Sequence, residues 1–212
     1  MSRLPAAQRR EQLLDRAAEL FARHGYARAT TAELAKSAGI TEPIIYRHFA
    51  SKRDLFIALI DRSADRTLKM WEAHLAGATD PAERLRRLVG DNPMVGDATR
   101  DSYRVLLQAI TEVNDDQIHH AASRHLGNLH AFLRKELELA QSEHKVNPRV
   151  SADLIAWLLI YVGMGYGVLH ALNIPGHGTD AAGHHVQDLI NKLLISRTLP
   201  AQGPMSRGQA ED

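Results

Sequence analysis

The sequence contains no cysteine, which excludes disulfide bonds and thiolate chemistry. Aromatic residues make up only 5% of the chain, and runs that predict β-strands are nearly absent. Positive and negative charges almost cancel, 26 Lys and Arg against 25 Asp and Glu, so net charge does not by itself indicate a nucleic-acid partner. The fingerprints of P-loops, zinc proteases and serine hydrolases are also absent from the sequence. These absences favour an all-α protein and disfavour an enzyme.

The N-terminal residues are basic and polar and lack the apolar core of a signal peptide, so we expect a cytoplasmic protein. One long apolar run does occur, nineteen residues over 154–172, and its length alone allows a membrane span. The run contains three glycines and lies among amphipathic helices. A helix buried within protein is the simpler interpretation, and we expect no membrane partner.

The stretch 30–49 predicts two short helices joined by a tight turn. Ala35, Gly39 and Ile45 lie four and six positions apart. A small residue lets the second helix approach, a glycine takes a positive φ in the turn, and a branched apolar residue locks the pair. The spacing is typical of a helix-turn-helix, although an ordinary helical hairpin is compatible with the triplet alone.

A longer pattern around the triplet is more specific. The stretches TTAELAKSAGIT (30–41) and IYRHFASKRDL (45–55) resemble the TetR family of bacterial transcriptional regulators. The resemblance covers about residues 8–60. It implies an all-α fold of about nine helices, with an N-terminal three-helix DNA-binding domain and a larger helical domain for ligand binding and dimerisation. We expect these domains at 1–52 and 53–198, followed by a polar tail at 199–212 that is predicted to be disordered.

The second helix of the motif is the expected recognition helix, because its polar side chains suit the major groove of DNA. The resemblance implies that base-facing positions are Thr41, Glu42, Pro43, Ile44 and Arg47, and that phosphate-binding positions are Tyr46, His48 and Lys52. Thr31, at the N-terminus of the first helix, is a further candidate phosphate ligand. Ile45 and Phe49 are expected to pack inward.

The charge distribution agrees with this placement. Residues 1–55 hold ten Lys and Arg against six Asp and Glu, a net charge of +4, whereas 56–212 hold sixteen against nineteen, a net charge of −3. The basic excess coincides with the predicted DNA-binding motif, as neutralisation of phosphates requires.

Local signals predict where the helices begin and end. We expect a helix over 6–24, with Gly25 as a left-handed C-cap, and a second, short helix that a Thr30–Glu33 capping box opens. Thr41 and Ser51 are predicted to cap the next two helices. Beyond these, the pattern predicts helices over 52–77, 81–89, 102–113, 116–144, 151–172 and 186–197, with a break at 91–101.

Two further surfaces are expected in the larger domain. The resemblance implies an apolar effector pocket among the central helices, although for each residue taken singly plain core is the simpler interpretation. The candidate lining residues are Met70, Trp71, Tyr103, Leu106, Phe132, Trp157 and Tyr161. The resemblance implies that the last two long helices pair across a two-fold axis, and the candidate contacts are Gly163, Gly167, Val186, Leu189, Ile190 and Leu193.

The chain has twelve histidines, but those on the predicted helix 116–144 lack the four-residue spacing of helical zinc pairs. We therefore expect no metal and no cofactor. The sequence predicts a homodimeric DNA-binding regulator, a repressor released from a pseudopalindromic operator by a small apolar or amphipathic effector. The alternatives are a helical ligand-binding or interaction module without specific DNA reading, and an enzyme on an all-α scaffold.

Overall fold

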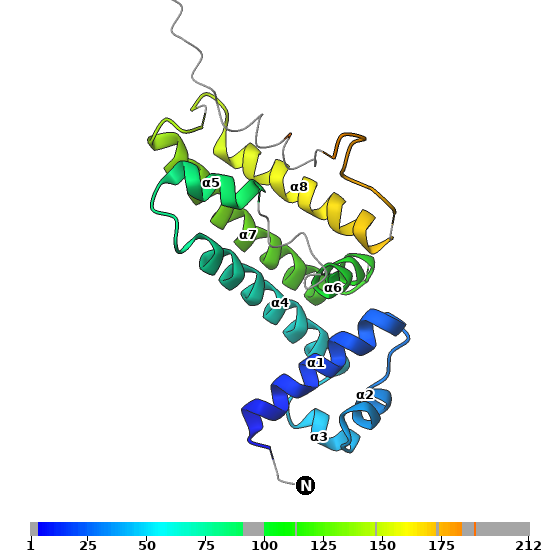
Figure 1. Cartoon of the computed structure of the whole chain (residues 1–212). Coiled ribbons are helices and arrows are strands. Elements are labelled where there is room, and N and C mark those ends of the chain that lie inside the picture. Colours follow the sequence, from blue (N-terminus) through cyan, green and yellow to red (C-terminus); the bar gives the residue numbers. More distant parts are fainter. Residues whose placement is uncertain are drawn as a thin grey trace, which may run out of the picture.

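The computed structural model describes residues 4–90, 100–112, 114–146, 148–172 and 174–183, together with Leu189. These residues form eight α-helices (Figure 1). In chain order the helices are α1 (Ala6–His24), α2 (Thr31–Ala38), α3 (Glu42–Tyr46), α4 (Lys52–Leu75), α5 (Pro81–Gly90), α6 (Arg100–Thr111), α7 (Asp116–Ser142) and α8 (Ala152–Ala171). The predicted all-α fold is confirmed.

Helices α1, α2 and α3 form a small unit at one end of the molecule, which we call the head (Figure 1). Helix α4 has 24 residues, about 36 Å at 1.5 Å per residue, and runs from the head into a body made of α5 to α8. The side chain of Ser51 caps α4 by accepting from the N–H of Asp54. One continuous helix thus belongs to both parts.

Two apolar clusters hold these parts together. The first begins in the head and continues into the body, since Phe21 of α1 and Phe56 of α4 share it with Leu106 of α6 and Ile118 of α7. The second lies wholly in the body, where Trp71, Leu85, Leu137 and Ile160 come from α4, α5, α7 and α8. The first turns of α4, which follow the predicted domain boundary at residue 52, therefore contribute to the core of the head.

Most helix boundaries agree with the local signals, with some differences. Helix α6 begins at Arg100 rather than at 102. Gly25 has the expected positive φ of 77°, but its ψ of 156° is extended and not left-handed helical. The predicted break at 91–101 is too long, because Arg100 and Asp101 already belong to α6; its other residues, 91–99, fall outside the described residues. The predicted helix 186–197 also falls outside them, except that Leu189 is helical.

Candidate nucleic-acid interface

Helix α2 is fixed at both ends by its own sequence. The N–H and hydroxyl of Thr30 donate to the carboxylate of Glu33, and the N–H of Glu33 donates back to the Thr30 hydroxyl at 3.2 Å. The two bonds from Thr30 lower the pKa of Glu33. At the other end Gly39 adopts the left-handed conformation, with φ 66° and ψ 35°. The predicted capping box and glycine turn are confirmed. The turn at Gly39 ends α2 and leads the chain into α3.

Helix α3 buries one side and presents the other. Ile45 and Phe49 are buried as predicted, with 1% and 4% of their surface exposed. Ile44 is half-buried. The exposed side carries Thr41, Pro43, Tyr46 and Arg47. The predicted side-chain cap is wrong, because Thr41 takes the N-cap position without a side-chain cap bond.

Three polar side chains of α2 and α3 are bonded to one another. The Thr31 hydroxyl donates to Oε1 of Glu42, and the Tyr46 hydroxyl lies 3.4 Å from the same oxygen. The two hydroxyl oxygens are 3.2 Å apart. Three of the nine DNA-binding candidates therefore form one hydroxyl–carboxylate cluster that ties the start of α2 to α3.

Lys52 has a different environment from the one its predicted role suggests. Its ammonium donates to the carbonyl oxygens of Tyr26 at 2.9 Å, Ala27 at 3.3 Å and Ala29 at 3.1 Å. It also lies 4.5 Å from the centre of the Tyr26 ring. All three N–H donors of an ammonium are thus engaged. Lys52 closes the α1–α2 turn, and no donor is left over for a phosphate in this arrangement.

Other basic side chains of the head differ in their exposure and in the contacts that they make. Arg47 follows the last residue of α3 and is exposed, as is Lys36 on α2. Arg10 lies over the Phe49 ring, 4.7 Å from its centre. His48 is half-buried with its ring 6.5 Å from that of Phe49. Arg47 is the candidate cation that projects most freely from the recognition helix.

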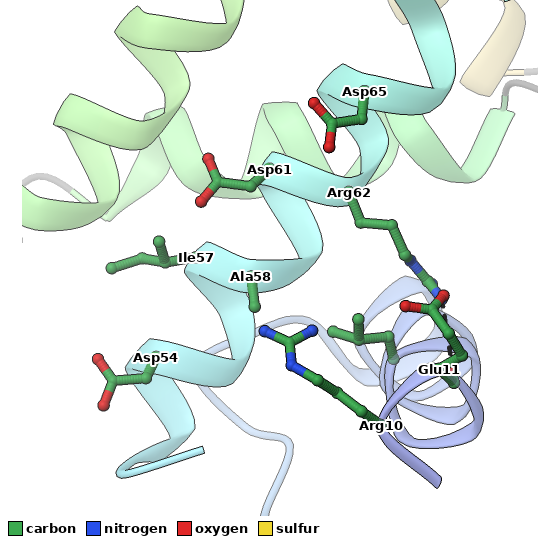
Figure 2. A pocket seen from close by; sticks show the side chains of 9 residues that line it. Arg10, Glu11, Asp54, Ile57, Ala58, Asp61, Arg62 and Asp65 are labelled. Atoms are coloured by element: carbon green, nitrogen blue, oxygen red, sulfur yellow. Dashed lines mark hydrogen bonds and ion pairs between the residues drawn. The ribbon is translucent and has the colours of Figure 1, made fainter. Parts of the chain in front are cut away.

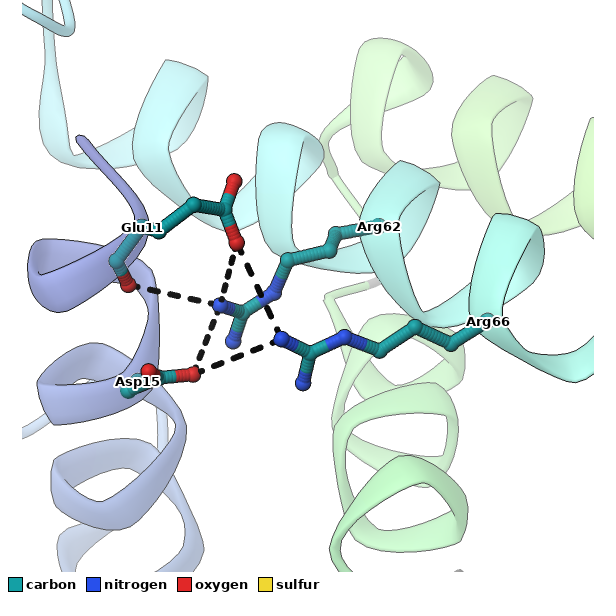
Figure 3. Close-up of polar contacts among 4 residues, drawn as sticks. All are labelled: Glu11, Asp15, Arg62 and Arg66. Atoms are coloured by element: carbon teal, nitrogen blue, oxygen red, sulfur yellow. Dashed lines mark hydrogen bonds and ion pairs between the residues drawn. The ribbon is translucent and has the colours of Figure 1, made fainter. Parts of the chain in front are cut away.

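An ion-pair cluster joins α1 to α4 (Figure 3). Nη1 of Arg62 donates to Oδ1 of Asp15 at 2.7 Å and to Oε2 of Glu11 at 3.2 Å. Arg66 lies farther from the same carboxylates, at 3.6 and 3.7 Å. The head is also bonded to the body through Gln108 of α6, whose Nε2 donates to the Phe21 carbonyl at 2.8 Å. Because these contacts join α1 of the head to α4 and α6, a shift of either helix would move the head.

A groove of about 390 Å³ lies beside this cluster, between α1 and α4 (Figure 2). Arg10 reaches into it from α1, and acidic residues of α4 line the opposite wall. Its lining residues are Arg10, Glu11, Leu14, Asp54, Ile57, Ala58, Asp61, Arg62 and Asp65. The groove is open and mostly charged, so it lacks the apolar enclosure expected of an effector pocket.

The predicted effector-pocket residues are only partly brought together. Met70, Trp71, Phe132 and Trp157 meet in the second apolar cluster. Leu106 belongs to the first cluster. The Tyr161 ring stacks on the Trp157 ring, with centres 6.2 Å apart, but its side chain lies at the surface and is 66% exposed. The side chain of Tyr103 falls outside the described residues.

Two polar atoms of α4 border the apolar body cluster, a feature that sequence patterns do not reveal. Within the described part of the chain, Nε1 of Trp71 and Nε2 of His74 are buried without a hydrogen-bond partner. Their rings pack edge to face at 6.4 Å. A buried donor without a partner costs about 1–3 kcal/mol, which a ligand acceptor would recover.

Helix α8 carries an exposed apolar stripe. The stripe consists of Leu154, Leu158, Tyr161, Gly165 and Leu169, together with Leu172 directly after the helix, spaced three or four residues apart. The segment Ala152–Leu169 is long and apolar enough to cross a membrane, with a mean hydropathy of 1.7, and 28% of it is buried. The other side of α8 packs on α7 and α6.

The two glycines of the predicted dimer contact are less exposed than the glycine between them. Gly167 is buried within the chain and Gly163 is half-buried, whereas Gly165 lies on the exposed stripe with open space around its Cα. Leu189 is 57% exposed. The other candidates, Val186, Ile190 and Leu193, fall outside the described residues.

Histidines do not gather into a metal site among the described residues. His125 is buried in α7, and burial lowers its pKa against a smaller opposing effect of Asp61. His130 stacks on Trp157, with ring centres 4.4 Å apart.

Comparison with known proteins completes the identification of the class. The family model described as bacterial regulatory proteins, tetR family, matches residues 13–59, which run from α1 through the first turns of α4. The HTH-type transcriptional activator FasR of Mycolicibacterium smegmatis is 40% identical over 88 residues, covering 42% of this chain and 40% of that protein. The nucleoid occlusion factor SlmA of Marinobacter nauticus is 31% identical over 144 residues, covering 68% of this chain and 74% of that protein.

A solved structure matches the fold over almost the whole chain. A transcriptional regulator from Saccharomonospora viridis, in complex with choline, aligns with a TM-score of 0.78 and 24% identity, covering 90% of this chain and 100% of that one. The helical fold and the exposed helix-turn-helix define a DNA-binding regulator. The chain belongs to the TetR family of bacterial transcriptional regulators. Because members of this family are regulators and not enzymes, the prediction that the chain is not an enzyme is confirmed.

Proposed function

We propose that the chain is a cytoplasmic, homodimeric repressor that binds a pseudopalindromic operator and is released by a small apolar or amphipathic effector. The observation that carries the DNA-binding part is the exposed side of α3, where Thr41, Pro43 and Arg47 project from the end of the head. Arg47 is proposed to read a base edge, because a guanidinium can bond guanine O6 and N7. Thr31 and Tyr46 are proposed to bind phosphates.

A homodimer is supported by the apolar stripe on α8. Leu154 and Tyr161 are each 66% exposed, which leaves large apolar surfaces in water. A second copy that packs the same stripe would bury them, and a two-fold axis would then present two recognition helices to DNA. Half-site centres are expected about 34–36 Å apart, or a multiple of that distance.

An effector site in the body is supported by the second apolar cluster. Trp71, Phe132 and Trp157 supply apolar surface, and the unpaired indole N–H of Trp71 supplies a directional donor. The similar regulator from Saccharomonospora viridis holds choline, a small molecule. Binding next to α4 would favour one head position over another, and a coupling of about 1–3 kcal/mol changes DNA affinity roughly 5–150-fold.

Selection of bound duplexes from a random DNA pool tests the DNA-binding proposal. Enrichment of a pseudopalindrome is expected, with half-site centres separated by about one helical turn or a multiple of it. Salt-sensitive binding without enrichment would instead favour an interaction module without specific DNA reading. Arg47→Ala is expected to change the enriched bases, whereas Lys36→Ala, at an exposed cation of α2, leaves them unchanged.

The repressor and effector parts are tested with the selected operator. A reporter whose promoter overlaps the operator is expected to fall in expression when the protein is present, and a rise would make the protein an activator. Small apolar and amphipathic molecules are then screened for release of the labelled operator. Both tryptophans of the chain border the proposed site, so binding is expected to change intrinsic fluorescence, and Trp71→Phe should weaken a ligand that accepts from the indole.

A further inference from the structure

The hydroxyl–carboxylate cluster of the head places a negative charge where DNA binding calls for a free donor. Thr31 is the first residue of α2, and Glu42 and Tyr46 are the first and last residues of α3. Each hydroxyl has a single proton to donate. The Thr31 proton points to Oε1 of Glu42, and Tyr46 at 3.4 Å has that same oxygen as its acceptor. Both protons are therefore committed within the protein.

We propose that Glu42 acts as an internal substitute for a DNA phosphate, which every duplex has to displace before Thr31 and Tyr46 can bind it. A carboxylate and a phosphate present the same kind of acceptor with the same sign of charge. A phosphate that accepts from these hydroxyls takes over the bonds of Glu42, and the two anions repel each other while they compete. The inference rests on the proposed function, in which Thr31 and Tyr46 bind phosphates.

The position of Glu42 on the helices favours this competition. Its carboxylate bonds the first residue of α2, where backbone N–H groups without helical partners attract an anion. The capping box engages the N–H of Glu33, which leaves the preceding N–H groups of the first turn available. Glu33 is held separately by Thr30, so the two acids of this surface have distinct partners.

If every duplex has to displace Glu42, then removing its carboxylate should tighten binding to DNA of any sequence. Glu42→Gln weakens the internal bonds by removing the charge, and Glu42→Ala removes them. Both variants are expected to tighten binding to a non-specific 30-base-pair duplex, Glu42→Ala by about tenfold, or 1.4 kcal/mol. Glu19→Gln is the control, because it removes one negative charge from an exposed acid of α1 without freeing a hydroxyl. It is expected to raise the affinity for the same duplex about twofold or less.

A double-mutant cycle separates competition from simple charge repulsion. Glu42→Ala is introduced into the wild-type chain and into the Thr31→Val, Tyr46→Phe chain, which has no hydroxyls to release. The gain in affinity is expected to fall from about tenfold to about twofold in the second background. Equal gains in both backgrounds, or no gain in the wild-type chain, would overturn the inference. Circular dichroism of each variant controls for folding.

Operator selection with the wild-type protein distinguishes a failure of the proposed function from a failure of the role proposed for Glu42. If the wild-type chain enriches no operator, the proposed function fails. If it enriches one and the cycle shows equal gains, the proposed function stands and the role of Glu42 is rejected.

Discussion

At the scale of single residues, Lys52 shows how a cation of the predicted DNA-binding surface can stabilise the fold. Its ammonium bonds three carbonyl oxygens of the α1–α2 turn and lies over Tyr26. We predict that Lys52→Met lowers the free energy of unfolding by about 1–3 kcal/mol, because hydrogen bonds from a charged donor are lost. The melting temperature should fall by several degrees, about 2–4 °C for each kcal/mol.

The salt dependence of DNA binding distinguishes this structural role from direct phosphate binding. If Lys52 only closes the turn, the folded Lys52→Met protein keeps the wild-type slope of affinity against salt. A phosphate-binding lysine would reduce that slope by about one unit on substitution. Lys36→Met on exposed α2 is the control, and it should leave the melting temperature unchanged.

His125 makes stability depend on pH. Burial lowers the pKa of His125 in the folded chain, so the unfolded chain, with a pKa of about 6.5, binds the proton more readily. Its contribution to stability is therefore present above about pH 6.5 and is lost as the pH falls from there towards the lowered pKa, at up to about 1.4 kcal/mol per pH unit. We predict that His125→Gln flattens this part of the stability profile.

Urea unfolding at several pH values between about 7.5 and 5 tests the prediction. His120→Gln provides the control, because His120 lies on the same helix and is less buried than His125. A profile that is equally steep in the wild-type and His125→Gln proteins would assign the acid sensitivity to other groups.

At the scale of elements, the α1–α4 ion pairs offer a matched comparison. Arg62 and Arg66 come from the same helix and approach the same two carboxylates, but their side chains are 11% and 61% exposed. We predict that Arg62→Met destabilises the chain by about 1–2 kcal/mol, since hydrogen bonds from a mostly covered guanidinium to Asp15 and Glu11 are lost. Arg66→Met should change the free energy of unfolding by less than about 0.5 kcal/mol, as expected of an exposed pair. Similar losses for both variants in urea unfolding would contradict the geometry.

The elements themselves were predictable because their signals are local. Thr30, Glu33 and Gly39 determine the ends of α2 through contacts within a few residues, and the structure shows those contacts. The partners of Lys52 lie 23 to 26 residues away, so helix patterns around it cannot reveal the carbonyls that it bonds. The hydrogen bond between Thr31 and Glu42 likewise depends on how α2 packs against α3.

The exposed side of α8 was not predictable for a related reason. A helix that is apolar all round has no periodicity to show which side faces the chain, so its neighbours α6 and α7 decide. Gly163, Gly165 and Gly167 are equivalent in the sequence, yet only Gly165 lies on the exposed stripe.

For the molecule as a whole, the α8 stripe is the proposed contact between two copies of the chain, so a change in it tests whether the protein is a dimer. Leu158 belongs to the stripe and is 50% exposed. In a two-fold dimer the same residue is buried near its own copy, so Leu158→Glu would place two carboxylates in one apolar contact. We predict that Leu158→Glu shifts the protein to a monomer in sedimentation at micromolar concentration.

The matched control is Leu139→Glu, which adds the same charge at a leucine of α7 that is 45% exposed. That variant should remain dimeric and should bind the operator normally. The Leu158→Glu monomer presents one recognition helix, so it loses the second half-site and binds the full operator no more tightly than a single half-site. A Leu158→Glu protein that stays dimeric with full operator affinity would place the dimer contact elsewhere and leave the stripe for another partner.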